Sequence, residues 1–345
     1  MTSIITPKEI EIPGAPRLEG LRFRTCAGLD DYEPMLAVYT ACAEVDGLVE
    51  RMTVADMANF VEHPIARDSV DDLVLAEVAG RIVGYAWVNH RREAGGDEVH
   101  GHRGYVHPAW RRRGIGTALA GFACERAFAT PVAGDPDSPR LLRTFMLETE
   151  REGHALFRRL GYAPIRYAFN MVRDLTRPIP DLPLPAGLEI RPAVKADFRR
   201  IWEAEREAFQ DAWGYFPWPE EAFQRFATYP HYDPDLWRVA WDGAEVAGGV
   251  LNFVNEEENA AFGRRRGYTE DIFVRRPWRR RGLASALIAR SLQALRELRL
   301  DEAALAVDAE SPTGALNLYT RMGYTTAQTW TTYALRLPSD KKEPR

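Results

Sequence analysis

Lysine is almost missing from this chain of 345 residues. Only four positions carry it: Lys8, Lys195, Lys341 and Lys342. Arginine supplies the rest of the 45 basic side chains, and 50 acidic residues outnumber them, so the net charge is −5. A protein with this balance has no overall field to draw it onto nucleic acid or an anionic membrane, and we expect neither as a partner.

Cysteine is scarce as well. Cys26, Cys42 and Cys124 lie far apart and form no Cys-x-x-Cys pair, which is typical of inert thiols in a reducing compartment. The sequence also has no His-Glu-x-x-His pattern, no signal-peptide pattern and no run of about 18 apolar residues. It therefore predicts a cytoplasmic protein that binds no metal and does not span a membrane.

The length suggests two domains of ordinary size, and 46% apolar with 28% charged residues is normal for a globular protein. One stretch resists both helix and sheet because it contains four prolines, Pro178, Pro180, Pro183 and Pro185. The predicted organisation is an N-terminal arm (1–20), a first domain (21–173), a linker (174–187), a second domain (188–337) and a polar tail (338–345).

The pentapeptide Trp-Arg-Arg-Arg-Gly occurs twice, at Trp110–Gly114 and at Trp278–Gly282. Each copy follows a short apolar run that reads as a strand, and each leads into an amphipathic helix pattern. The sequence therefore contains the same strand, arginine-glycine turn and helix N-terminus twice. A wider repeat surrounds the pentapeptide.

Both halves show the same series of expected elements. In the first half these are a strand at 21–24, a helix at 30–42, a hairpin of 73–77 and 82–88, strands at 104–106 and 141–147, a short helix ending at Gly161 and a strand at 167–173. In the second half they are a strand at 188–191, a helix at 196–209, a hairpin of 237–241 and 245–253, strands at 271–274 and 303–307, a short helix ending at Gly323 and a strand at 331–337.

The turn has a physical use. The N-terminus of a helix carries unpaired N–H groups and a partial positive charge, and small residues let a pyrophosphate approach them closely. Flanking arginines add charge for phosphates at the rim. A tight loop with a solvated basic face is the alternative for one copy, but two copies in the same setting favour phosphate binding.

Together with a second motif, the turn resembles the signature of the GCN5-related N-acetyltransferase (GNAT) superfamily. The pattern Arg-x-x-Gly-x-(Gly/Ala) matches the family's acetyl-CoA pyrophosphate loop, and residues 311–324 are similar to its second signature, a short helix with Ala-x-x-Leu-Tyr-x-x-x-Gly-aromatic. The resemblance covers 21–173 and 188–337. It implies an α/β (α+β) fold with two tandem GNAT-type domains, each a mixed, mostly antiparallel sheet flanked by helices.

The resemblance also implies that acetyl-CoA is the cosubstrate and that the strand end, the turn and the first helical residues bind it. In the second half these residues are Phe273, Val274, Arg279, Arg280, Arg281, Gly282, Leu283, Ala284 and Ser285. In the first half they are Val106, Arg111, Arg112, Arg113, Gly114, Ile115, Gly116 and Thr117.

Acetyl transfer to an amine requires a base for the ammonium and an acid for the departing thiolate. By resemblance to the family, Tyr319 on the short helix is the acid. Glu270, on the strand that leads into the second arginine-glycine turn, is the base. The neighbouring Asp271 is expected on the opposite face of that strand. The alternatives are a packed core tyrosine and an ion-paired strand glutamate.

The first half departs from this pattern. Counted from the turn, His102 matches Glu270, and in the short helix Phe157 stands at the tyrosine position. A phenyl ring cannot protonate a thiolate, although His102 could act as a base. We therefore expect catalysis in the second domain, whereas the first domain binds CoA without turnover.

The acceptor region is expected in 211–218, which varies within the family. Asp211, Trp213 and Tyr215 would suit a flat or cationic amine. A packing loop is the alternative. The resulting prediction is an acetyl-CoA-dependent N-acetyltransferase that acts on a small-molecule amine, as a monomer or homodimer. A CoA-binding sensor without turnover and a protein or peptide N-acetyltransferase remain open.

Overall fold

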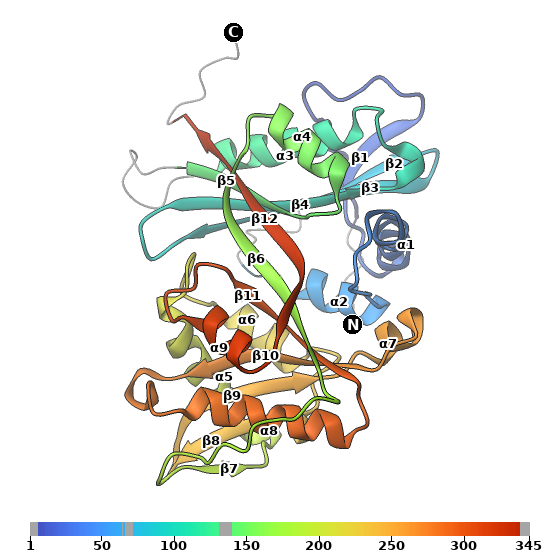
Figure 1. The fold of residues 1–345 in the computed structure, drawn as a ribbon. Coiled ribbons are helices and arrows are strands. Elements are labelled where there is room, and N and C mark those ends of the chain that lie inside the picture. The colour runs from blue at the N-terminus through green and yellow to red at the C-terminus, as the bar shows by residue number, and fades with distance from the viewer. Residues whose placement is uncertain (1–5, 64, 66–71, 131–139, 339–345) are drawn as a thin grey trace. The chain divides into compact units, whose positions relative to one another are not determined.

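The computed structural model describes residues 6–63, 65, 72–130 and 140–338, so the predicted tail lies outside the described residues except for Pro338 (Figure 1). The chain forms two compact units. Unit 1 contains residues 1–165 and 331–345, and unit 2 contains residues 166–330.

Unit 1 is built on a sheet in the order β1-β2-β3-β4-β5, with β12 next to β5. All of the pairs from β1 to β4 are antiparallel, whereas β4 and β5 are parallel. The strands are β1 (Leu21–Thr25), β2 (Leu73–Val78), β3 (Arg81–Arg92), β4 (Glu98–Val106), β5 (Arg140–Leu147) and β12 (Thr325–Leu337).

Helices cover both faces of this sheet: α1 (Leu29–Asp46) and α2 (Val54–Glu62) on one, α3 (Ile115–Ala129) and α4 (Arg151–Arg159) on the other (Figure 1). The alternation of side chains along β2 shows why. Val74 and Ala76 belong to the core under α3, whereas Leu73 and Leu75 belong to a second cluster with α1. A strand with apolar residues on both faces must be covered twice.

Unit 2 repeats this plan, with sheet order β7-β8-β9-β10-β11-β6. Only β10 and β11 are parallel among the pairs assigned in its described residues. Its strands are β6 (Ala163–Asp174), β7 (Glu189–Arg191), β8 (Arg238–Asp242), β9 (Glu245–Phe253), β10 (Arg266–Val274) and β11 (Glu302–Asp308). Its helices are α5 (Phe198–Ala208), α6 (Glu220–Ala227), α7 (Glu256–Phe262), α8 (Leu283–Glu297) and α9 (Ala315–Arg321). The main core lies under α8, and α5 packs on β9 and β10.

The last strand of each sequence half belongs to the other unit. From Arg166 onward β6 lies in unit 2, where it pairs with β11 and places Met171 in the core. From Thr331 onward β12 lies in unit 1, whose core includes Tyr333 and Leu337. The sequence predicts both strands but places each of them in its own half.

The proline-rich stretch is extended, as its composition predicts, with no helix or strand at 175–188. It is not a free spacer, because Ile179, Leu182 and Leu184 pack against the unit 2 core. The Arg173 guanidinium also donates to the Pro178 carbonyl at 2.7 Å. In the described part of the chain, none of the helices is long and apolar enough to cross a membrane.

Unit 1 should depend on the C-terminal strand for its stability. Tyr333 is fully buried, and its hydroxyl lies 2.9 Å from the His154 Nδ1 atom. We expect Tyr333→Ala to destabilise unit 1 by about 3–5 kcal/mol, as aromatic truncation in a core does. Hydrogen exchange should then accelerate in β2 and β3 but not in β8 and β9. Arg336→Ala, at an exposed position of the same strand, is the control; equal acceleration in both units would contradict this assignment.

Candidate active sites

The two arginine-glycine turns have the same backbone conformation. Arg112 and Arg280 have φ of 61° and 60°, and Gly114 and Gly282 have φ of 87° and 85°. Positive φ at the glycines is the conformation that residues with a Cβ adopt reluctantly. In both copies the next residue begins a helix, α3 or α8, whose first N–H groups have no side-chain cap. The turn therefore leaves two helix N-termini open to an anion.

The first arginine of each turn is an internal brace. Arg279 donates to the Val274 carbonyl at 2.9 Å, to the Ala208 carbonyl at 2.9 Å and to the Asp211 carboxylate at 2.5 Å. It thereby ties the end of β10 to the end of α5. In unit 1, Arg111 likewise donates to the Val106 carbonyl and to the Asp46 carboxylate.

Asp211 is the carboxylate that receives the unit 2 brace. Hydrogen bonds from Arg276 and Arg279 hold the pKa of Asp211 at about 2. Its position was predicted to contact the acceptor, but the structure assigns its oxygens to the arginines. Trp213 is 40% exposed and carries the Arg166 guanidinium 4.7 Å above its ring, while Tyr215 is half-buried.

The remaining arginines of the turns, Arg112, Arg113, Arg280 and Arg281, are exposed. Their guanidinium groups are therefore available to phosphates in a way that Arg111 and Arg279 are not. Not every predicted contact is a surface residue. Ile115, Leu283 and Phe273 are buried, and Ile115 and Leu283 belong to the cores of their units, where they seat the helices that follow.

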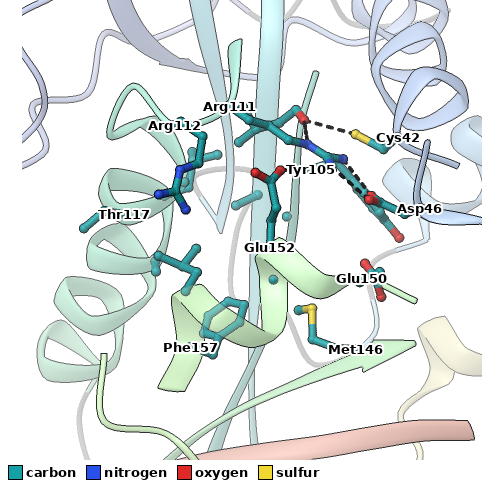
Figure 2. Close-up of a pocket in the computed structure, with 18 of the residues that line it drawn as sticks. Cys42, Asp46, Tyr105, Arg111, Arg112, Thr117, Met146, Glu150, Glu152 and Phe157 are labelled. Carbon is teal, nitrogen blue, oxygen red and sulfur yellow. Dashed lines mark hydrogen bonds and ion pairs between the residues drawn. The ribbon is translucent and has the colours of Figure 1, made fainter. Parts of the chain in front are cut away.

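Unit 1 contains a cavity of about 360 Å³ that opens beside its turn (Figure 2). Figure 2 shows Arg111 bonded to Asp46 on one side, Arg112 and Thr117 on the other, and the Phe157 ring below. Of the predicted CoA contacts, the lining includes Val106, Arg111, Arg112, Gly114, Gly116 and Thr117. The cavity thus combines the turn, the α3 N-terminus and the ends of β4 and β5.

In both units the two parallel strands pair briefly. The ladder between β4 and β5 ends at Gly101 and Arg143, and that between β10 and β11 ends at Tyr268 and Ala304. One long polar side chain reaches across to the neighbouring strand beyond each ladder. In unit 2 the Glu270 carboxylate accepts from the Ala306 N–H at 3.1 Å.

A β-bulge distinguishes the strands of the two units. In unit 2, Glu270 pairs with Leu251 and Phe273 with Gly249, so Asp271 and Ile272 face one residue of β9. The ladder between β3 and β4 in unit 1 has no such shift. The bulge inserts one residue into β10, and Asp271 adopts a φ of 47°. Bulges of this kind redirect a side chain and are frequent beside active sites.

Because of this bulge, the predicted match between His102 and Glu270 is wrong. Counting along the ladders makes Arg103 the counterpart of Glu270 and His102 the counterpart of Thr269. Hydrogen bonds agree: the Tyr162 hydroxyl lies 2.9 Å from His102 Nε2, and the equivalent Tyr324 hydroxyl lies 2.6 Å from Thr269 Oγ1. Counting back from the turn therefore matches residues of β4 and β10 correctly only as far as the bulge.

Unit 1 therefore has a cation where unit 2 has a carboxylate. Arg103 is 1% exposed, donates to the Phe145 carbonyl and pairs with Glu150 at 2.6 Å. Burial lowers the pKa of His102 to about 3, which keeps the ring neutral. Phe157 lines the same cavity, on the short helix α4, at the position where unit 2 has Tyr319.

Tyr319 lies on α9 and is 7% exposed. Burial and the nearby Glu270 charge raise the pKa of the Tyr319 phenol above its usual value. Within the described residues its hydroxyl has no hydrogen-bond partner. The same side chain also belongs to the unit 2 core, which is the alternative role predicted for it.

Family models match both halves of the chain. A model described as the acetyltransferase (GNAT) family matches residues 198–324, and an acetyltransferase (GNAT) domain model matches residues 70–164. A mycothiol acetyltransferase from Salinispora tropica is 31% identical over 294 residues, which cover 82% of this chain and 89% of the relative. The mycothiol acetyltransferase of Streptomyces coelicolor is 29% identical over 92% of this chain and 95% of its own.

Solved structures show the same architecture. A GCN5-related N-acetyltransferase from Sphaerobacter thermophilus superposes with a TM-score of 0.65 at 26% identity, over 92% of this chain and 96% of that one. A tandem GNAT protein from the clavulanic acid biosynthesis pathway gives 0.62 at 18% identity, over 94% and 100%, which shows the fold alone. The chain belongs to the GNAT acetyltransferase family. It is an N-acetyltransferase with two tandem GNAT domains, as the two motifs predict.

Substitutions should distinguish the role of Arg279, which braces the turn, from that of the exposed Arg280. We expect Arg280→Gln to raise KM for acetyl-CoA about tenfold, the effect of losing one charge-assisted hydrogen bond, with Tm unchanged. Arg279→Gln should lower Tm because it releases Asp211 and two carbonyls. Steady-state kinetics and thermal melts measure both. A normal Tm for Arg279→Gln would show that the brace is dispensable.

His102 should make unit 1 sensitive to acid. The pKa of His102 falls from 6.5 to about 3 on folding. Below pH 6.5 the histidine is therefore protonated in the unfolded chain but neutral in the folded one. Stability should therefore decrease as pH falls, by about 1.4 kcal/mol per unit for this residue. His102→Gln should reduce the loss of Tm between pH 7 and 5. An identical loss in His102→Gln would contradict the assignment.

Proposed function

We propose that unit 2 transfers the acetyl group of acetyl-CoA directly to the amine of a small-molecule acceptor, and that unit 1 binds CoA without turnover. One observation supports the division of labour above others. Both units have the same turn, but only unit 2 combines it with a strand carboxylate, Glu270, and a phenol, Tyr319.

The residues of unit 2 suit each proton transfer. The new N–C bond forms as the C–S bond breaks, so the amine must lose a proton and the thiolate must gain one. The Ala306 N–H fixes the Glu270 carboxylate, which accepts the amine proton. Tyr319, whose pKa is raised, stays protonated at neutral pH and donates to the sulfur. The amine nitrogen and the sulfur are thus served by different groups.

Unit 1 has different residues at both of these positions. Arg103 cannot accept a proton from an ammonium and would repel it, and Phe157 cannot protonate a thiolate. The cavity nevertheless retains the turn, the open α3 N-terminus and exposed arginine charge. These features favour CoA binding as a structural or regulatory role for this unit.

The names of the relatives favour a small acceptor. Several of them are called mycothiol acetyltransferase, so the desacetyl form of mycothiol is the first acceptor to assay with acetyl-CoA. N-terminal peptides test the alternative of a protein acetyltransferase. Tight CoA binding with no turnover of either class would favour a sensor.

The assignment of the active unit depends on Tyr319. We expect Tyr319→Phe to lower kcat about 10²–10⁴-fold, the usual contribution of a general acid, with little change in KM for acetyl-CoA. Phe157→Tyr, the reverse change in unit 1, should leave kcat unchanged. Loss of activity in Arg103→Met with full activity in Tyr319→Phe would reverse the two units.

A further inference from the structure

Two carboxylates of unit 2, one buried and one half-buried, have no role in the steps above. Glu205 lies on α5 and is 4% exposed, and Asp271 is the residue that the bulge adds to β10. The Tyr232 hydroxyl donates a hydrogen bond to the Asp271 carboxylate. Burial, together with the negative charge of Asp271, raises the pKa of Glu205 well above its usual value, and burial also raises that of Asp271.

No cation compensates this pair among the described residues. Neither carboxylate takes part in a salt bridge there, and the buried Glu205 Oε2 atom has no hydrogen-bond partner. Unpaired carboxylates are costly to bury, and folded proteins ordinarily place a cation, a donor or a proton beside them. Glu205 and Asp271 lie on elements that pack on each other, α5 and β10, and neither has a counter-charge in the part of the chain described, so they point to a positively charged ligand.

The position of the pair ties it to the catalytic groups. Glu205 is three residues before Ala208, and Asp271 is three residues before Val274; the carbonyls of Ala208 and Val274 both accept from Arg279. Asp271 also directly follows Glu270 in the chain. The pair thus lies at the end of α5 and β10 that the turn braces.

Aromatic rings surround the third member of the group. The Tyr232 ring centroid lies 5.3 Å from Phe226, 5.3 Å from Trp237 and 4.7 Å from Tyr229. Aromatic faces and carboxylates together are the environment in which proteins bind organic ammonium ions. A hydrated metal ion fits less well, and no metal-binding group of three His, Cys, Asp or Glu residues occurs among the residues described.

We propose that Asp271 and Glu205 bind the ammonium group of the acceptor and deliver it to Glu270. This inference rests on the proposed function and adds the residues that select a cationic amine. Unit 1 offers the contrast. It has no bulge, hence no counterpart of Asp271, and its buried Arg103 would repel the same group.

The test uses two CoA conjugates of equal size, S-(2-aminoethyl)-CoA and S-propyl-CoA, and measures their Kd by calorimetry on the full chain. The first carries an ammonium just beyond the sulfur, and the second is its neutral counterpart. We expect the wild type to prefer the ammonium conjugate about tenfold, as one charge-assisted hydrogen bond would give. Asp271→Asn and Glu205→Gln should bring the ratio close to one.

Glu203→Gln, at an exposed position of the same helix, should keep the wild-type ratio. Binding in unit 1 is common to all variants, so a change of ratio reports unit 2. Two separate variants guard against a folding defect in either. Equal binding of both conjugates by the wild type, or an unchanged ratio in both variants, would overturn this inference alone. If neither conjugate binds the wild type, the proposed function fails as well.

Discussion

The main structural difference between the two units of this enzyme is the single residue that a bulge adds to β10. Up to the turn, the units share the same arginine brace, the same positive φ angles and the same open helix N-terminus. Upstream of the bulge, every residue of β10 is displaced by one position relative to β4. Glu270 thereby reaches the gap between the parallel strands, where unit 1 has Arg103, and β10 gains Asp271, for which β4 has no counterpart. A one-residue shift moves side chains to new positions throughout a strand, so this small change alters the chemistry of the whole site.

The division between what is duplicated and what differs follows from charge. The turn is the same in both units, and the pyrophosphate binding that we propose for it depends on backbone N–H groups and small residues. Beyond the turn, a buried side chain needs a partner of its own, and each unit supplies a different one. Arg103 is compensated by Glu150, whereas Glu270 is held by a backbone N–H. A buried cation and a half-buried carboxylate cannot serve the same acceptor.

The sequence predicts the parts of this arrangement that are local. Phe157 and Tyr319 could be assigned because each is set at a fixed distance from a helix-ending glycine, Gly161 or Gly323. The bulge could not be predicted, since Asp271 is not a glycine and no residue marks the extra position. The braces were missed for another reason: an arginine fork binds a carboxylate as well as a phosphate, and only the folded chain brings Asp211 to Arg279.

The exchange of strands could not be predicted either, because a strand has the same alternation of apolar and polar residues in whichever unit it lies. The exchange does make each unit depend on residues of the other repeat. The core of unit 1 includes Tyr333 from the C-terminal end of the chain, and the core of unit 2 includes Met171 from the end of the first repeat. Removal of the first repeat would take a strand and part of the core from unit 2. Each unit therefore draws part of its core from the other repeat, so removal of one repeat would destabilise both units.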